Sequence, residues 1–312
     1  MLSVFFTVFP VFFILGASYL IGRFKYLPDS VADALNAYAL RVGVPVLLFL
    51  AMYRLDFSKA FQVPMLVSFY TGAVTCFILG IVLSRIFWKR RPGESVAVGF
   101  CAVFSNSVLI GIPVVQLAFG DAILAPVFGI IALHASSLYT LGMVTMEFAR
   151  QDGRGFGETV RAAMSAVMAN PLMFGILTGI ALNLTGLELF IPLERALDMI
   201  RVTAIPVSLV GIGIVLNRYR ISSELSEALM VSVLSLFIHP LIAFVLSYHV
   251  FGLDMLFVQA ATVLAAMPPG MNVYIFANLY KRAQGLSASV LVIANILSVF
   301  TISGWLLFMQ SL

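Results

Sequence analysis

Long apolar runs separated by short polar turns dominate the chain. Several of these runs approach or exceed about 18 residues, enough for a helix to cross the hydrocarbon core of a bilayer. The alternation typical of membrane β-barrel strands is missing from the sequence, so helices are expected. Apolar runs and their Pro, Gly and charged breakers predict ten membrane helices. They fall near 3–22, 30–52, 63–87, 95–119, 123–147, 167–185, 195–216, 227–250, 255–280 and 286–309.

Composition supports an all-α integral membrane protein. The chain has 312 residues, of which 62% are hydrophobic and 10% are charged. A soluble domain has about a quarter charged residues. The net charge of +4 comes from basic residues between the apolar runs. The expected environment is therefore a lipid bilayer, with no nucleic-acid partner. Cys76 and Cys101 lie inside apolar runs and read as small buried residues rather than as a disulfide or metal site.

Two breaker-rich segments interrupt otherwise apolar helices at matching places. The first is Asn106–Pro113 and the second is Met267–Tyr274, which lies 161 positions later. The same offset relates further pairs: Pro10 and Pro171, Pro45 and Pro206, Ser137 and Ser298, and Thr140 and Thr301. A constant offset predicts a duplicated unit, and five helices per unit make the repeat inverted. The expected organisation is a first repeat at 1–150, a cytoplasmic linker at 151–166 and a second repeat at 167–312.

Basic residues set the expected orientation. Thirteen of the 18 Lys and Arg residues fall on one predicted side, against four on the other. The thirteen are Arg23, Lys25, Arg85, Lys89, Arg90, Arg91, Arg150, Arg154, Arg161, Arg218, Arg220, Lys281 and Arg282. This asymmetry predicts a multi-pass protein of the cell (inner or plasma) membrane with both termini outside the cytoplasm.

The paired breaks are the candidate site. Pro removes a backbone donor and distorts the helix, and in lipid such a break persists only where protein, solute or a wet cavity satisfies it. Matching breaks in two halves of a membrane protein point to the binding site of a transporter. Each break offers a half-helix N-terminus with unpaired N–H groups, which suits an anion. Asn106 and Asn272 are expected to orient the solute, beside Ser107, Gly111, Pro113, Pro268, Pro269 and Gly270.

Acidic residues are scarce inside the predicted helices. Asp33 and Glu147 are the nearest, and both lie close to helix ends. Carriers of cations generally keep a carboxylate within the membrane. The sequence therefore favours an anionic or neutral solute.

Several other polar residues allow two interpretations. His134 and Asn295 are repeat mates, and each is expected either to form an interhelical hydrogen bond or to contact solute. Tyr139 either lines the cavity or packs. Arg41, midway along the second helix, either snorkels to the surface or attracts an anion. Arg201 is expected to snorkel outward.

Three classes of function were compared. A secondary carrier explains the repeat and the paired breaks, whereas a channel for small anions or neutral solutes is the alternative and would carry polar rings along a pore. An enzyme is not expected, because paired acids, a metal set and a nucleophile with its base are all missing from the sequence pattern. No cofactor or metal is expected, no nucleotide motif is found, and coupling to Na+ or H+ stays open.

At the broken segments the chain resembles the auxin efflux carrier family. Asn106-Ser-Val-Leu-Ile-Gly-Ile-Pro113 is similar to the motif Asn-Thr-Leu-Val-Met-Gly-Ile-Pro in that family's fourth helix. Ala265-Ala-Met-Pro268-Pro-Gly270 is similar to the Ala-Leu-Pro-Gln-Gly motif of the ninth helix. Leu138-Tyr139-Thr140-Leu141 resembles the family's fifth helix, and Asn36 with Pro45 resembles its second.

The resemblance implies the PIN-like fold shared with bile acid symporters, in which the fourth and ninth helices are broken and cross. Helices one, two, six and seven would form a dimerising scaffold, and helices three to five and eight to ten a mobile transport bundle. Solute would bind at the crossover, with Asn36, Arg41, Asn295 and Ser298 as accessory residues, and be moved by an elevator-like exchange of access. Residues 63–70 contain no acid and Ser235 replaces a basic residue of plant members. These departures disfavour auxin itself, and the resemblance to compact bacterial members implies a small carboxylate such as malonate or malate, with an auxin-like acid as a further candidate.

Overall fold

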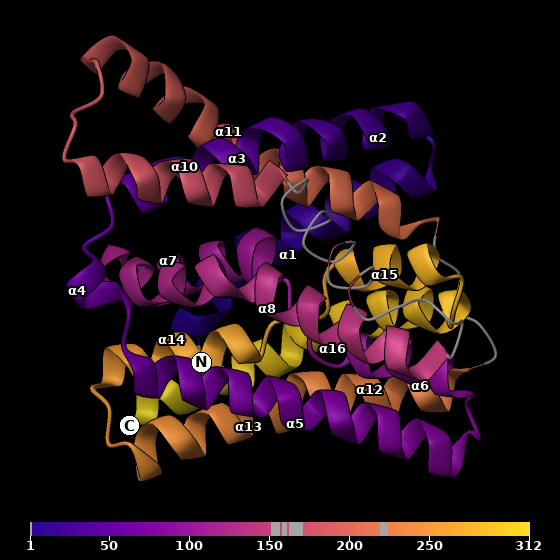
Figure 1. The fold of residues 1–312 in the computed structure, drawn as a ribbon. Helices are drawn as coiled ribbons and strands as arrows, with labels where there is room; N and C mark the ends of the chain where they lie inside the picture. Colours follow the sequence, from indigo (N-terminus) through magenta and orange to yellow (C-terminus); the bar gives the residue numbers. More distant parts are fainter. Residues whose placement is uncertain (1, 151–156, 158–160, 162–170, 219–223) are drawn as a thin grey trace. The chain divides into compact units, whose positions relative to one another are not determined.

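The computed structural model describes residues 2–150, 157, 161, 171–218 and 224–312, so most of the predicted linker 151–166 lies outside the described residues. Every element in these ranges is helical, which confirms the all-α class (Figure 1). The α-helices are α1 (Leu2–Arg23), α2 (Asp29–Tyr38), α3 (Val44–Tyr53), α4 (Phe57–Ala60), α5 (Val63–Phe87), α6 (Pro92–Cys101), α7 (Ile112–Phe119), α8 (Leu124–Arg150), α10 (Pro171–Thr185), α11 (Ile191–Leu216), α12 (Leu225–Val233), α13 (His239–Phe244), α14 (Met255–Ala265), α15 (Asn272–Tyr280) and α16 (Gln284–Ser311). The π-helices are η1 (Ala39–Gly43), η2 (Ser107–Gly111), η4 (Leu234–Ile238) and η5 (Val245–Val250), and η3 (Asp121–Ile123) is a 3₁₀-helix.

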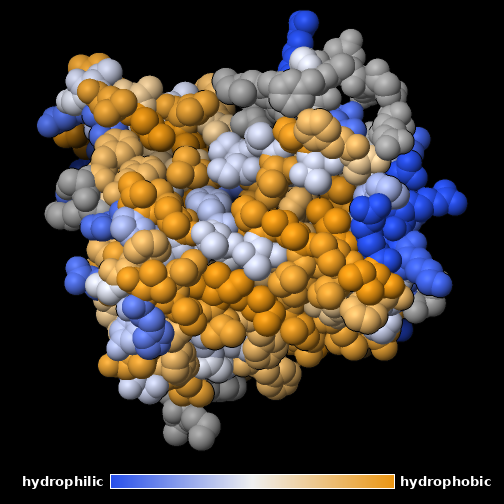
Figure 2. Space-filling model, turned by 60° about the horizontal axis from the view of Figure 1, so that its bottom comes forward, coloured by the Kyte–Doolittle hydropathy of each residue, from blue (hydrophilic) through white to orange (hydrophobic). Residues whose placement is uncertain are grey.

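The helices are those of a multi-pass membrane protein. Within the described residues, six helical stretches are long and apolar enough to cross a bilayer. They are Ser30–Tyr53, Val63–Phe87, Asp121–Ala149, Ile191–Leu216, Leu225–Val250 and Gln284–Ser311. Shorter apolar helices include Ser107–Phe119 and Met255–Ala265. Figure 2 shows a face that is largely hydrophobic, with hydrophilic residues gathered toward its margins. The full set of ten spans and their inverted relation stay predictions.

Predicted and observed helix ends agree closely. The predicted helix 63–87 coincides with α5, and the predicted helix 227–250 corresponds to the continuous stretch from α12 to η5. The predicted helices 95–119 and 255–280 are each interrupted at their breaker-rich segments. The first stops at Cys101 and resumes at Ser107, and the second stops at Ala265 and resumes at Asn272.

Three of the π-helices lie directly before a proline. The residues four positions before Pro45, Pro113 and Pro240 belong to η1, η2 and η4 respectively. A proline cannot donate to the carbonyl four residues back and clashes with it, and a widened π turn relieves that clash. The carbonyl freed by Pro240 is that of Leu236, which accepts the indole N–H of Trp305 at 3.0 Å. A buried carbonyl is thus satisfied away from water, as the membrane interior requires.

The chain forms two compact units. The smaller unit comprises Pro10–Ala60 and Met164–Arg218, and therefore α1 from Pro10 onward, α2 to α4, α10 and α11. The larger unit comprises Met1–Phe9, Phe61–Ala163 and Tyr219–Leu312, and contains α5 to α8 and α12 to α16. Each unit has its own buried residues, and the two are described separately below.

Glycines bring two helices of the smaller unit into close contact, with α10 running along α3 (Figure 1). A Cβ atom at Gly175 would lie 2.3 Å from the carbonyl oxygen of Pro45, and one at Gly179 would lie 2.4 Å from that of Phe49. Any side chain at either position would force the helices apart. Small residues at helix contacts are the usual way in which membrane helices pack this closely.

Polar contacts fix the end of the smaller unit where α3 stops. The Asn183 amide donates to the carbonyl oxygens of Tyr53 at 2.6 Å and Leu55 at 2.9 Å, which satisfies groups left open at the helix end. Arg54 pairs with Asp198 at 2.7 Å and with Glu194 at 2.6 Å. The hydrogen bonds that Arg54 donates to Asp198 are the main cause of the raised pKa of the Arg54 guanidinium.

Arg201 was expected to snorkel outward, and that expectation stays a prediction. Its Nε donates to the Asp198 carboxylate at 2.8 Å. The physical reason is local: an acid one helical turn earlier gives the guanidinium a partner at the correct spacing. Arg41, by contrast, is exposed, and it lies in η1.

The larger unit is held by aromatic and small apolar packing. Phe100 of α6 and Phe276 of α15 are both fully buried and stack with ring centroids 4.0 Å apart. Because these helices belong to the two interrupted segments, the stack joins them. Cys76 and Cys101 are buried free thiols.

Candidate functional site

The two broken segments meet inside the larger unit. Residues 102–106 and 266–271 are not helical, and Ser105 forms an antiparallel bridge with Pro269. The Asn106 N–H donates to the Pro268 carbonyl at 2.8 Å, and the Gly270 N–H donates to the Phe104 carbonyl at 3.0 Å. Consecutive prolines explain the local geometry, because Pro268 and Pro269 have no N–H to continue α14. We call residues 102–111 and 266–272 the crossover.

Asn106 organises the first half-helix that leaves the crossover. Its side-chain Oδ1 accepts the Leu109 N–H at 3.3 Å, as an N-cap does. Its backbone carbonyl accepts the N–H groups of Ile110 and Gly111 at 3.3 and 3.0 Å. The sequence interpretation treated Asn106 mainly as a solute contact, and the structure adds this capping role.

Several backbone donors at the crossover remain unbonded. Within the described chain, no hydrogen bond joins the N–H groups of Ser107, Val108 or Asn272 to another residue. They lie at the beginnings of η2 and α15, where the helix dipoles present partial positive charge. The starts of η2 and α15 thus bring their unbonded N–H groups to one place. A carboxylate can accept hydrogen bonds from such groups.

Side chains of α8 support the crossover. The Tyr139 hydroxyl donates to Oδ1 of Asn272 at 3.2 Å, so the Asn272 amide nitrogen is directed away from Tyr139. His134 contacts the Ser105 carbonyl through Nε2 at 3.2 Å. The hydroxyls of Ser105 and Ser107 lie 2.9 Å apart. His134 therefore makes the interhelical hydrogen bond that was one of its two expected roles.

Gly111, Pro268, Pro269 and Gly270 of the motifs lie at the crossover, and Pro113 lies just beyond it. A Cβ atom at Gly270 would lie 3.4 Å from the Cβ of Asn106, and one at Gly111 would lie 3.4 Å from Cγ of Met267. These are ordinary contact distances, so neither glycine is required by crowding in this structure. Pro113 is buried near the start of α7.

Some accessory candidates take part in other contacts. Asn295 donates to the Leu291 carbonyl and Ser298 donates to the Asn295 carbonyl, so that both hydrogen bonds lie within α16 rather than at the crossover. Asn36 donates to the Ala32 carbonyl within α2. Asn36 and Arg41 belong to the smaller unit, and their accessory role stays a prediction.

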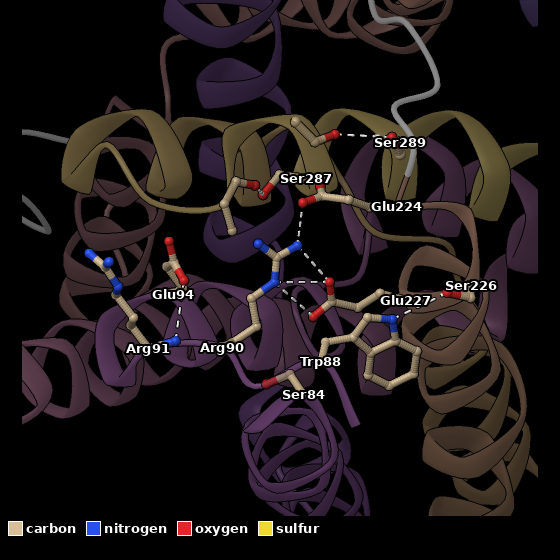
Figure 3. Close-up of polar contacts among 12 residues, drawn as sticks. Ser84, Trp88, Arg90, Arg91, Glu94, Glu224, Ser226, Glu227, Ser287 and Ser289 are labelled. Atoms are coloured by element: carbon tan, nitrogen blue, oxygen red, sulfur yellow. Dashed lines mark hydrogen bonds and ion pairs between the residues drawn. The ribbon is translucent and has the colours of Figure 1, made fainter. Parts of the chain in front are cut away.

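A buried ion cluster was missed by the sequence analysis, which placed the nearest intramembrane acids at Asp33 and Glu147. Glu227, in the first turn of α12, is fully buried. Its carboxylate accepts from Arg90 at 2.7 Å, and Glu224 pairs with the same guanidinium (Figure 3). The hydrogen bond to Glu227 raises the pKa of Arg90. The sequence signal for this cluster was a pair of acids three residues apart at a helix start, Glu224 and Glu227, together with Arg90 in a distant turn.

The cluster joins two regions that are far apart in sequence. Arg90 lies in the turn between α5 and α6, and Trp88 of the same turn donates its indole N–H to Ser226 at 3.2 Å. The Arg91 N–H donates to the Glu94 carboxylate at the start of α6, at 3.2 Å (Figure 3). These contacts tie the turn before the first broken segment to the start of α12.

Comparisons with known proteins identify membrane transporters as relatives of this chain. A family profile described as "Membrane transport protein" matches residues 3–306. A Rhizobium meliloti (strain 1021) protein named "Putative malonate transporter" is 21% identical over 304 residues, covering 97% of this chain and 95% of that protein. An "Uncharacterized transporter" of Methanothermobacter thermautotrophicus is 28% identical over 306 residues, covering 96% of each chain. With nearly its whole length matched, the chain belongs to the membrane transport protein family, the auxin efflux carrier family that its broken-helix motifs resemble.

Proposed function

We propose that this transporter moves a small organic anion, a mono- or dicarboxylate of the malonate or malate kind, across the cell membrane and binds it at the crossover. One observation carries the proposal. Unbonded N–H groups at two helix starts meet where two broken segments pair, and this supports binding of a carboxylate. The relative named for malonate transport makes malonate the first solute to test.

Asn106 and Asn272 would complete the site. Asn106 uses its side-chain oxygen to cap Leu109, and Asn272 uses its side-chain oxygen to accept from Tyr139. In both residues the oxygen is engaged, which leaves the amide NH₂ as the group that can donate to solute. Two amide donors together with backbone N–H groups match the acceptor oxygens of a carboxylate.

Movement would occur by alternating access in an elevator-like manner. The division into two compact units supports this, because the broken segments lie wholly in the larger unit and could move with it as one body. The smaller unit would be the static scaffold and the contact surface of a homodimer. Mass measurement of the protein in nanodiscs tests the dimer, and a monomer mass would exclude it.

The site assignment can be tested by placing a negative charge where the anion binds. Asn106→Asp keeps an oxygen that caps Leu109, and Asn272→Asp keeps an acceptor for Tyr139, so both variants are expected to fold. Each added carboxylate would repel an anionic solute. We expect uptake of radiolabelled malonate or malate into proteoliposomes to fall by at least about 100-fold in either variant, as expected for a like charge in contact.

A matched control is Asn278→Asp, the same change in α15 but at its far end. Asn278 also uses its side-chain oxygen as an acceptor, from Gln284, and it lies about two turns beyond Asn272. This variant is expected to keep most of the uptake. If Asn106→Asp and Asn272→Asp transported the anion as well as Asn278→Asp, the solute would bind elsewhere.

A further inference from the structure

His134 lies in α8, only 5% exposed, and its ring is fixed against the crossover. Its Nε2 lies 3.2 Å from the Ser105 carbonyl oxygen. A carbonyl oxygen can only accept, so Nε2 carries the hydrogen in this contact. In the neutral ring the other nitrogen, Nδ1, then presents a lone pair. That atom is buried and has no hydrogen-bond partner among the described residues.

Among the described residues, no carboxylate or other fixed negative charge is found to act on His134. Phe69 and Phe104 meet the ring edge-on, with centroids 5.6 and 5.0 Å away. The ionisable group that acts on it electrostatically is His239 of α13, which can only become a second cation. Tyr70 of α5 and Tyr139 of α8 are nearby ionisable groups, and both donate their hydroxyls to other oxygens. A proton on His134 would need an anion brought from outside the protein.

We propose that His134 is a proton-binding site that is loaded together with the anionic solute, so that the carrier is a proton symporter. This rests on the proposed function. Ser105 links the two ligands, because its carbonyl contacts His134 while its backbone pairs with Pro269 at the crossover. In the proton-binding step the Nδ1 lone pair takes one proton from a hydronium ion on one side of the membrane, so that an N–H bond forms and an O–H bond of that ion breaks to leave water. The proton returns to water on the other side when the anion leaves.

The coupling is reciprocal. An anion at the crossover supplies the counter-charge that an imidazolium lacks, and the imidazolium in turn raises affinity for the anion by the same factor. Empty carriers return without a proton because a buried unpaired charge is costly. If His134 had only a structural role, its Nε2 contact with Ser105 would suffice, and its Nδ1 would not need to bind a proton.

The test measures the accumulation of malonate driven by a pH gradient separately from the exchange of malonate across the membrane. His134→Gln places an amide NH₂ near the position of Nε2 but cannot titrate. In proteoliposomes with the membrane potential clamped at zero, an inside-alkaline gradient of one pH unit should drive about tenfold accumulation of malonate by the natural protein for one coupled proton. The variant should accumulate no malonate above the outside concentration, and the exchange of labelled for unlabelled malonate that it retains should no longer depend on pH.

His239→Gln is the matched control. Nε2 of His239 lies 3.1 Å from the Phe69 carbonyl oxygen of α5 rather than bonding a residue of the crossover, and its Nδ1 likewise has no hydrogen-bond partner among the described residues. It should keep tenfold accumulation. Undiminished accumulation by His134→Gln, or equal loss in both variants, would overturn the proton site and leave the anion site standing.

Two further outcomes are informative. If His134→Gln exchanged no malonate, His134→Asn would be tested as the second variant. Independently of either variant, exchange by the natural protein at the same rate from pH 5 to pH 8 would overturn the proposal. If the natural protein exchanged neither mono- nor dicarboxylates, the proposed function would be wrong and the proton site would fall with it.

Discussion

At the scale of single residues, Glu227 carries a carboxylate that is shut off from solvent at the start of α12. Arg90 supplies its counter-charge, with Nη2 at 2.7 Å. Removing one member of a buried ion pair leaves the other charge unpaired, at a cost of about 3–5 kcal/mol. We therefore predict that Arg90→Ala lowers the free energy of unfolding by about that amount, measured by thermal or chemical denaturation in detergent.

The same pair offers its own control. Replacing both members by apolar residues of similar size, Arg90→Met with Glu227→Leu, removes both charges and is often neutral or stabilising for a buried pair. The double variant should therefore recover most of the stability that Arg90→Ala loses. If the double variant were as unstable as Arg90→Ala, this contact would stabilise the protein through the fit of its side chains rather than through their charges.

At the scale of helices, the contact of α10 with α3 depends on glycine. A Cβ atom at Gly179 would lie 2.4 Å from the Phe49 carbonyl oxygen, and backbone cannot yield as a flexible side chain does. We predict that Gly179→Ala destabilises the protein by about 1–3 kcal/mol, the usual range for overpacking. Gly16→Ala is the matched control, since nothing lies within 4 Å of its added Cβ. It should be neutral or slightly stabilising, because alanine favours helix, and equal effects of the two changes on the melting temperature would contradict the close contact.

Helix positions could be predicted from the sequence because they follow from local composition. The predicted helix 63–87 coincides with α5, and the breaker-rich segments interrupt helices at Cys101 and Ala265. Proline, glycine and apolar length act within a few residues, so the chain alone reveals them. The π-helices before Pro45, Pro113 and Pro240 have the same local cause, but of these prolines only Pro113 was part of a predicted break, and no π turn was predicted.

Partners distant in the chain could not be predicted in the same way. Tyr139 bonds Asn272 across 133 positions, and Arg90 bonds Glu227 across 137. No local pattern specifies which helices pack together, and the two acids near a helix start and the distant Arg do not by themselves show that Glu227 is buried. The pairing of the two broken segments was expected only because the repeat placed them at matching positions.

At the scale of the whole molecule, alternating access requires that the crossover open to each side of the membrane in turn. Val108 is partly buried and next to the unbonded N–H groups, whereas the native thiols Cys76 and Cys101 are buried. We predict that Val108→Cys reacts with a membrane-impermeant maleimide added to either face of oriented proteoliposomes, because the larger unit presents the site to both sides over time. Saturating malonate should slow both reactions by at least about threefold, since bound solute covers the residue.

Phe300→Cys provides the matching negative control, because Phe300 is 74% exposed on an apolar helix face and should lie in lipid. It should react poorly from both faces, with or without malonate. Reaction of Val108→Cys from one face only, under all conditions, would contradict alternating access even if the anion site were correct. Reaction from both faces without protection by malonate would instead show that the crossover opens but that this anion does not occupy it. The labelling experiment thus tests the motion and the site separately, and transport measurements alone cannot separate the two.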